Sequence, residues 1–354
     1  MRLERPSPTT QEILDSGAIP RLRGYIVRPG KVSDSVFGGE GSYVDKATKR
    51  RVDFENPPLE DGNGLPVRIM VRTDRISTHD INRGNIPFKG QILASNHNFM
   101  RRLLIAELGT SQLDIPGLED SAAVTVAENL TQIPLEMVLR AYMAKTNTET
   151  SLYVHYMRGE RTFCGHALPE GLIANGKLPD IIDTPTTKSD EHDELILPAD
   201  IAKLGICTLA QYEVVKRHAT DAFRKVAKAL LERGLIAVDT KTEHGINSRN
   251  QIVVQDEVWT MDSSRFWLLK DYTEQMTKLR SGEITELELK ALSKEYARKF
   301  SKGEEGYSDE ERALIAVRYV DGIEQLLGRP FVPDMRPWEE RVVSGLEKAV
   351  ETLS

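Results

Sequence analysis

The sequence predicts an α+β fold, because strands precede helices in each half of the chain. No GxGxxG motif follows an expected strand, and the GxxxxGK[ST] pattern has no match, so neither a dinucleotide-binding site nor a P-loop is expected. The clearest helix, residues 208–233, is followed by two strands. A chain of 354 residues is long enough for two lobes or two small domains.

The first strands are expected near the amino terminus. Residues 24–37 are typical of a strand, a turn and a second strand, with Pro29-Gly30 supplying the turn. Residues 38–66 are rich in Gly, Asp, Glu, Lys and Pro, which indicates an exposed insertion or a long loop. Residues 65–73 are again β-rich.

The middle of the chain predicts one helix and one long irregular segment. Residues 96–108 carry apolar side chains at helical spacing. Residues 134–143 form a dense apolar segment that is interrupted by Glu136 and Arg140. Residues 159–194 are rich in Gly, Pro, Thr and Asp, and a loop of that length is usually functional or disordered.

The second half has clear start and stop signals. Thr208 can cap the helix 208–233, and Gly234 stands where a carboxyl-terminal cap belongs. Strands at 235–245 and 251–258 follow, joined by a polar turn. The remainder is expected to be helical: Ser308 with Glu311 forms a capping box for a helix that ends at Gly328, and 338–353 is a last amphipathic helix.

Composition restricts the class of protein. The net charge of −7 argues against a general nucleic-acid binder, which needs clustered Lys and Arg. The two cysteines, Cys164 and Cys207, make no zinc framework and fit a reduced compartment. Neither a secretory signal nor a membrane-spanning stretch is expected, so we expect a cytoplasmic protein without membrane partners. The oligomeric state is left open, and a homo-oligomer is one alternative.

An acidic hairpin is the most informative local feature. Strand alternation puts Asp239, Lys241 and Glu243 on one face, and the hairpin is expected to bring Glu243 near the start of the second strand, with Asp256 beyond it. Mg²⁺ is commonly held by one or two carboxylates plus nucleotide phosphates. Spacing alone favours a solvated hairpin with ordinary surface charge. The apolar run 235–238 that leads into it indicates instead an internal strand that delivers charge to a cleft.

Three cations mark further candidate positions. In Gly30-Lys31, the glycine would let backbone N–H groups approach phosphates and the lysine would add charge, although a plain turn with a surface lysine is the alternative. Arg140 lies among apolar residues and needs a partner, either Glu136 or a bound anion. Arg265 lies beside hydroxyls and aromatics, which suits recognition of phosphate or carboxylate. For each arginine, a structural ion pair is the alternative.

Taken together, these segments resemble the SAICAR synthetase (phosphoribosylaminoimidazole-succinocarboxamide synthase) family of purine biosynthesis. The matching runs occur in the family's order and cover most of the chain between about Gly24 and Trp267. They are Gly30-Lys31-Val32, Thr73–Asp80 with Ile86–Gly90, Pro134–Arg140, Pro185–Lys188 with His192–Glu194, Asp239–Gly245, and Asp256-Glu257 with Asp262–Trp267.

The resemblance implies two α+β lobes with the nucleotide in the cleft between them, and we place the boundary near residue 130, giving lobes 1–130 and 131–354. It implies an ATP- and Mg²⁺-dependent ligase that joins L-aspartate to carboxyaminoimidazole ribotide (CAIR). The implied residues are Gly30, Lys31, Val32 and Glu136 for ATP; Glu243 and Asp256 for Mg²⁺; Arg140, Thr146, Ser264 and Arg265 for CAIR; and Asp80, Lys89, Lys188 and Asp193 on catalytic loops.

Three departures from the family pattern bear on the substrate. Ser33 stands where the family commonly has a basic residue, Lys145-Thr146 replaces the usual Gly-Ser pair, and 38–66 resembles an insertion. They motivate a rival, an ATP-dependent amide ligase with another carboxylate or amine. Rivals of other classes are a small-molecule or lipid kinase and a catalytically inactive nucleotide-binding protein.

The candidate residues favour phosphate activation of a carboxylate over covalent catalysis by the protein. A carboxylate repels an incoming amine, and phosphoryl transfer from ATP turns one carboxylate oxygen into a leaving group. Such transfer needs positioning and charge neutralisation more than a nucleophile. The chain offers cations and metal ligands but no convincing Ser-His-Asp set. We therefore expect an acyl phosphate of CAIR, which the amine of L-aspartate attacks.

Overall fold

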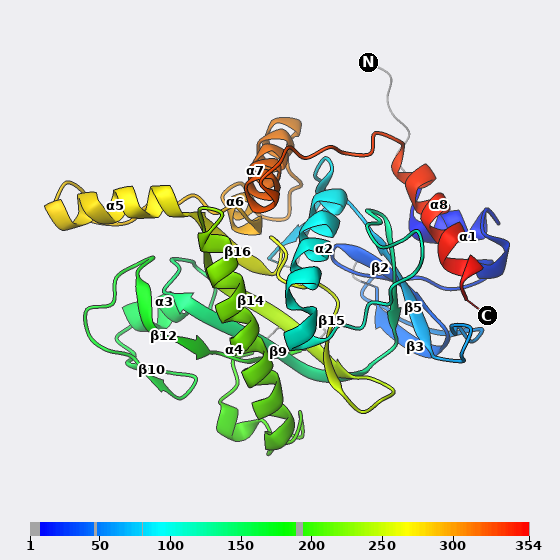
Figure 1. Cartoon of the computed structure of the whole chain (residues 1–354), viewed down its shortest axis with the longest axis horizontal. Coiled ribbons are helices and arrows are strands. Elements are labelled where there is room, and N and C mark those ends of the chain that lie inside the picture. The colour runs from blue at the N-terminus through cyan, green and yellow to red at the C-terminus, as the bar shows by residue number, and fades with distance from the viewer. Residues whose placement is uncertain (1–7, 46–47, 80, 189–193, 354) are drawn as a thin grey trace.

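Two antiparallel sheets form the frame of the computed structural model, which describes residues 8–45, 48–79, 81–188 and 194–353 (Figure 1). The first sheet has the order β1 (Arg28–Pro29), β2 (Ser33–Phe37), β5 (Val67–Arg72), β8 (Val124–Glu128). The second has the order β12 (Lys177–Asp183), β9 (Thr131–Tyr142), β14 (Leu235–Ile246), β15 (Ile252–Gln255), with β13 (Thr186–Thr187) on β9 and β16 (Ser264–Leu268) on β14. Antiparallel sheets with helices segregated to one face confirm the α+β prediction.

Short hairpins and helices complete the described chain. The hairpins are β3 (Gly39–Val44) with β4 (Arg51–Asn56), β6 (Arg75–Thr78) with β7 (Ile81–Asn85), and β10 (Thr162–Phe163) with β11 (His166–Ala167). The helices are α1 (Thr10–Asp15), η1 (Pro20–Leu22), α2 (Lys89–Leu108), α3 (Leu152–Met157), η2 (Pro198–Asp200), α4 (Leu209–Leu231), α5 (Leu269–Ser281), α6 (Lys294–Arg298), α7 (Asp309–Leu327) and α8 (Trp338–Glu351).

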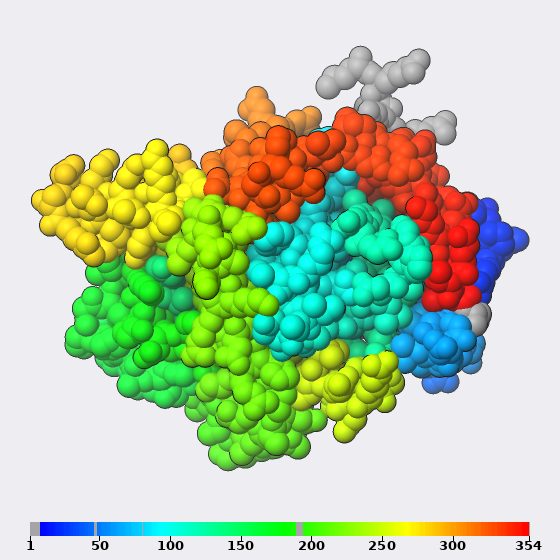
Figure 2. Space-filling view, in the orientation of Figure 1, coloured from blue at the N-terminus to red at the C-terminus, as the bar shows by residue number. Residues whose placement is uncertain are grey.

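Helices α2 and α4 cover one face of the second sheet, and α7 packs on α2 (Figure 1). Their buried side chains form one apolar core with β9 and β14, in which Phe223 of α4 meets Trp259 edge to face. Helix α5 projects from the body in the space-filling view (Figure 2), and none of its residues is fully buried. The opposite face of β14 is left for the charged side chains described below.

The last helix returns to the first sheet. Val342 and Leu346 of α8 share an apolar core with Val124 of β8. A Cβ atom on Gly345 would lie 2.7 Å from a methyl carbon of Val124, so only glycine permits this close packing. We therefore propose that α8 belongs with the first lobe, while the boundary near residue 130 stays a prediction.

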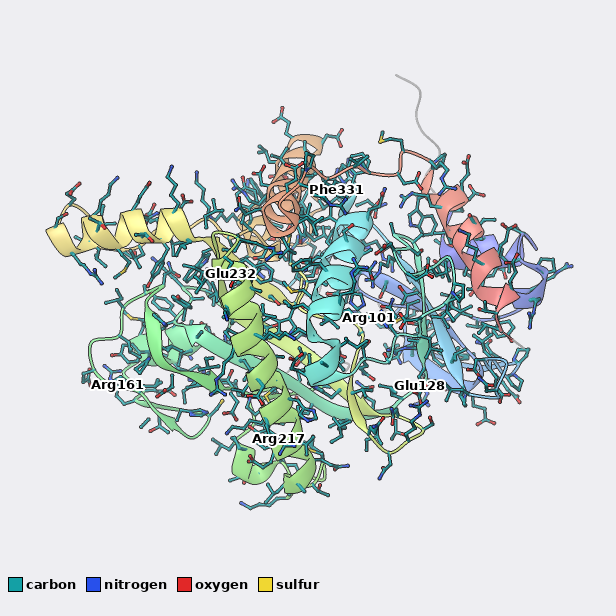
Figure 3. The ribbon with its side chains drawn as sticks, in the orientation of Figure 1. Arg101, Glu128, Arg161, Arg217, Glu232 and Phe331 are labelled. Atoms are coloured by element: carbon teal, nitrogen blue, oxygen red, sulfur yellow. The ribbon has the colours of Figure 1, made fainter. Side chains whose placement is uncertain are left out.

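A direct hydrogen bond joins the two sheets. Glu128, labelled in Figure 3, lies at the end of β8 and accepts a bond of 2.6 Å from the backbone N–H of Ser248 in the β14–β15 turn. The first sheet is thereby tied to the acidic hairpin.

The capping residues that were predicted next to their own helices are confirmed. Thr208 and Gln211 form a capping box at the start of α4, and Ser308 with Glu311 does the same at α7. Gly328 follows α7 in the left-handed conformation, with φ of +67°. The last predicted helix corresponds to α8.

Three predictions of local structure were wrong. The long-loop alternative for residues 38–66 was wrong, because they contain the β3–β4 hairpin, whose Phe54 packs against Phe37, while the insertion alternative stays a prediction. The predicted irregular segment 159–194 contains β10 to β13. The helix expected at 96–108 begins at Lys89, because the carboxylate of Asp74 accepts a hydrogen bond of 2.7 Å from the N–H of Gly90, a cap supplied from another element.

None of the helices that the structure describes is both long and apolar enough to cross a membrane.

Candidate active site

Strand β14 organises the charged face of the second sheet. Asp239, Lys241 and Glu243 alternate along it as predicted, and each finds a charged partner on the same face. The expected register of the hairpin was wrong in one respect. Glu243 lies opposite Gln255, at the end of β15 rather than near its start, because Ile246 pairs with Ile252. This register places Glu243 beside Asp256 instead of several residues away from it.

Glu136, Glu243, Lys188 and Lys241 form an ion-pair network in which Glu136 is fully buried and the other three side chains are partly buried. Glu136 on β9 is 2% exposed and accepts hydrogen bonds from Lys241 at 2.6 Å and Lys188 at 3.4 Å. Lys188 also donates to Glu243. Burial alone would raise the pKa of Glu243, but the two ammonium groups outweigh it and lower that pKa. Glu243 is therefore held as an anion beside two cations.

Asp256 contributes a carboxylate that its protein neighbours leave incompletely satisfied. Its backbone is left-handed, with φ of +62°, which is unusual for a residue other than glycine. Its Oδ1 is buried and has no hydrogen-bond partner among the described residues. Burial and the neighbouring Glu243 raise the pKa of Asp256, while Arg68 and Arg72 of β5 oppose that rise. The first sheet thus faces this carboxylate with two arginines.

The two carboxylates fit the donor set of a magnesium ion. Among the described residues, no group of three or more His, Cys, Asp or Glu side chains could hold a metal alone. Mg²⁺ is usually bound by one or two carboxylates plus phosphate oxygens and water, so the pair Glu243 and Asp256 is sufficient when a nucleotide supplies the rest. The unpartnered Oδ1 and the repulsion between the carboxylates both indicate a position for a cation.

A second cluster gathers Arg140 and Arg265 around Asp239. Arg265 donates from Nε to Asp239 at 2.9 Å, and Nη1 of Arg140 lies 3.7 Å from the same carboxylate. The expected partners of Arg140 were Glu136 or an anion. Asp239, rather than Glu136, pairs with Arg140, and the hydroxyl of Thr184 accepts a bond of 2.9 Å from its Nε, while the bound anion stays a prediction.

The arginine cluster has a hydrogen-bond donor that remains available for a ligand. Nη1 of Arg265 is buried without a hydrogen-bond partner among the residues described. Glu295 of α6 approaches that nitrogen at 3.8 Å and also pairs with Arg298 at 2.6 Å. Two guanidinium groups that share one carboxylate can bind a further anion, such as a phosphate.

Ser264 and Thr146, the other two residues expected at the substrate site, lie in different surroundings. Ser264 turns away from the arginines: its hydroxyl bonds to that of Thr240 at 2.8 Å, on the sheet face opposite Arg265. Thr146 is buried in the loop after β9. Its neighbour Lys145 pairs with Glu286 at 2.7 Å, which ties this loop to the segment after α5. The substrate roles of Ser264 and Thr146 stay predictions.

The predicted phosphate turn, Gly30 to Val32, joins β1 to β2. A Cβ atom at Gly30 would lie 2.2 Å from the carbonyl oxygen of Ser33, so the turn closes only with glycine. The carbonyl of Val32 accepts hydrogen bonds from the N–H and the hydroxyl of Thr73, at 3.1 and 2.7 Å. Lys31 is exposed at the tip. Ser33, which replaces a basic residue of the family pattern, pairs with Arg72 in the β2–β5 ladder.

Lys89 is fully buried, unlike the lysines of the ion-pair network. Its ammonium donates to Asp262 at 2.8 Å, and Tyr319 donates to the same carboxylate at 2.6 Å. Lys294 lies 4.0 Å from it. Two predicted catalytic residues, Asp80 and Asp193, lie outside the described residues.

Several charged residues of the site were missed. Strand alternation placed Asp239 and Lys241 on the face of Glu243, but they were given no role in the site, although that shared face was a signal for one. Arg68 and Arg72 are four residues apart in an apolar strand and so share its face, which was also a readable signal. Lys294, Glu295 and Arg298 come from a distant helix, and local sequence contains no signal that brings them here.

A family model described as SAICAR synthetase matches residues 63–313. A phosphoribosylaminoimidazole-succinocarboxamide synthase from Cytophaga hutchinsonii is 34% identical over 80% of this chain and 90% of its own length. A chloroplastic enzyme of the same name from Arabidopsis thaliana is 32% identical, over 80% of this chain and 69% of its own length.

Solved structures share the fold. SAICAR synthase from Saccharomyces cerevisiae, complexed with SAICAR, superimposes with a TM-score of 0.61 at 23% identity, over 87% of this chain and 97% of that chain. A SAICAR synthetase in complex with ADP gives a TM-score of 0.58 at 21% identity, over 87% of this chain and all of that one.

Proposed function

The chain belongs to the SAICAR synthetase family and is an ATP-dependent ligase, and we propose how the charged face of β14 serves that reaction. The ligase joins L-aspartate to the carboxylate of CAIR and yields SAICAR, ADP and phosphate. One observation carries the proposal: a single strand face holds the arginine cluster at Asp239 and the carboxylate pair at Glu243. Asp239 and Glu243 are four residues apart along the strand, which corresponds to about 13 Å.

This spacing suits a substrate with anionic groups at its two ends. CAIR carries a phosphate on its ribose and a carboxylate on its imidazole. We assign the phosphate to Arg140 and Arg265, where a guanidinium nitrogen has no hydrogen-bond partner among the described residues. The carboxylate then lies toward Lys241 and Glu243, where the γ-phosphate of ATP must be.

The phosphate turn and the ion-pair network would hold the nucleotide. Backbone N–H groups of the turn at Gly30 can approach phosphate oxygens, and Lys31 adds positive charge. Glu243 and Asp256 would hold Mg²⁺, which when bound neutralises phosphate charge during transfer. Lys188 and Lys241 lie within the same network and offset its negative charge.

The chemistry proceeds in two steps. A carboxylate oxygen of CAIR attacks the γ-phosphorus of ATP, the bond to ADP breaks, and an acyl phosphate forms. The amine of aspartate then attacks the acyl carbon, loses a proton and expels phosphate. The site contributes position and charge, since no protein atom forms a covalent bond to the substrate. We also propose a cytoplasmic location, in keeping with the two unpaired cysteines.

The function is tested by ADP release in mixtures of purified protein, ATP, Mg²⁺, CAIR and L-aspartate. We expect sustained ADP release in the complete mixture and at least tenfold slower release when CAIR or aspartate is omitted. A kinase would release ADP at the full rate without aspartate and leave a stable phosphate ester. That result, or no ADP release in the complete mixture, would contradict the CAIR ligase assignment.

A further inference from the structure

The phosphate turn is held on one side by a single arginine. Strand β1 has two residues, and one of them, Pro29, has no N–H to donate to the ladder. The carbonyl of Gly30 instead accepts a hydrogen bond of 3.0 Å from Nη2 of Arg75 in β6. Arg75 is 45 residues away in sequence, and within the described part of the chain its guanidinium bonds to neither the carboxylate pair nor the arginine cluster.

The guanidinium of Arg75 is itself fixed by a buried acid. Its two terminal nitrogens donate to Asp34 of β2, whose side chain is 5% exposed. Asp34 also accepts a bond of 2.6 Å from the hydroxyl of Thr10 at the start of α1. The planar fork of arginine can bond a carboxylate and a carbonyl at once, which an ammonium group does with less geometric control.

Holding the carbonyl of Gly30 determines where the next N–H points. The carbonyl of Gly30 and the N–H of Lys31 belong to one planar trans peptide unit, so they point in opposite directions. Glycine readily permits both orientations of such a unit. With the oxygen bonded to Arg75, the N–H of Lys31 is directed away from Arg75. A fixed N–H at this turn is the backbone donor that a phosphate requires.

We propose that Arg75 is a positioning residue: it holds the Gly30 carbonyl and thereby orients the Lys31 N–H toward the nucleotide phosphates. The inference rests on the proposed nucleotide role of this turn. Arg75 acts through the turn and does not itself touch the nucleotide.

Arg75→Gln removes the fork and tests the role directly. Loss of a charge-assisted hydrogen bond should weaken ADP binding about tenfold, measured by calorimetric titration, and raise the KM for ATP by a similar factor. The KM values for CAIR and aspartate should stay within twofold, because their site lies on the second sheet. Arg51→Gln is the matched control, since Arg51 pairs with Asp53 on the exposed β4 and should leave ADP binding unchanged.

A double variant separates positioning from simple loss of an ion pair. In Arg75→Gln, Asp34 is left without its cation, whereas Arg75→Gln with Asp34→Asn has no unpaired charge. The proposal expects ADP binding to stay weak in the double variant and to weaken less in Asp34→Asn alone, because the amide oxygen of Asn can still accept a hydrogen bond from Arg75. If Arg75→Gln does not fold, Arg75→Lys keeps the charge beside Asp34 and should still bind ADP several-fold more weakly.

The proposal is overturned by unchanged ADP affinity in the folded Arg75 variant or by recovered affinity in the double variant. Absence of ADP binding by the unsubstituted protein would also overturn it, since the turn would then hold no nucleotide. If that protein binds ADP but releases none from ATP with CAIR and aspartate, the ligase assignment fails while the titrations still decide the role of Arg75.

Discussion

Glu243→Gln is expected to lower kcat for ADP release by on the order of 10²–10³-fold while leaving the fold intact. The amide keeps the size of the side chain but removes one of two anions that we assign to Mg²⁺. Lys188 keeps a second partner in Glu136, 3.4 Å away, so the ion-pair network is not left with an isolated charge. The Mg²⁺ concentration for half-maximal rate should rise in the same variant.

Glu170→Gln provides the control for this prediction. Glu170 pairs with Arg161 at the surface, with 79% of its side chain exposed, and lies in neither charged cluster. Its kcat and Mg²⁺ dependence should match those of the unsubstituted protein. A Glu243→Gln protein with kcat within threefold of normal and an unchanged Mg²⁺ dependence would show that the carboxylate pair does not hold the metal.

Lys89→Met is expected to have the largest effect on stability. It removes the cation from a fully buried pair and leaves Asp262 with Tyr319 and the more distant Lys294. Breaking a buried ion pair costs about 3–5 kcal/mol. For a chain of this length, that loss lowers the melting temperature by about 5 °C. Differential scanning calorimetry measures both.

Lys270→Met is the matched control, because that lysine on α5 is 83% exposed and should change the melting temperature by less than 1 °C. Measuring kcat well below the melting temperature separates the two roles of Lys89. A structural lysine leaves kcat near normal there, whereas the predicted catalytic role requires a large loss. A melting temperature unchanged in Lys89→Met would contradict the importance of the buried pair.

The fold class and the capped helices could be predicted because their signals are local. Thr208 and Ser308 cap helices that begin one residue later, and alternation alone placed Asp239, Lys241 and Glu243 on one face. The start of α2 could not be predicted, since its cap is Asp74 from a different element. A side chain that satisfies a distant N–H has no periodic pattern in sequence.

The candidate site could be predicted only in part, because some of its contacts join segments that are distant in sequence. Glu243 and Asp256 lie on one hairpin as predicted, and its register brings them closer than the sequence indicated, while their role in metal binding stays a prediction. The pairing of Arg140 with Asp239 depends on the alignment of β9 with β14, strands about 100 residues apart. Two arginines share Asp239 because of how β9 and β16 align with β14, and no local stretch of the sequence indicates that alignment.

We propose that this site activates the CAIR carboxylate by phosphorylation. CAIR labelled with ¹⁸O in its carboxylate tests it, with mass spectrometry of the phosphate released during turnover with ATP and L-aspartate. One labelled oxygen should appear in each phosphate, because the carboxylate oxygen that attacks the γ-phosphorus leaves with it. Phosphate without label, formed in step with SAICAR, would contradict the account.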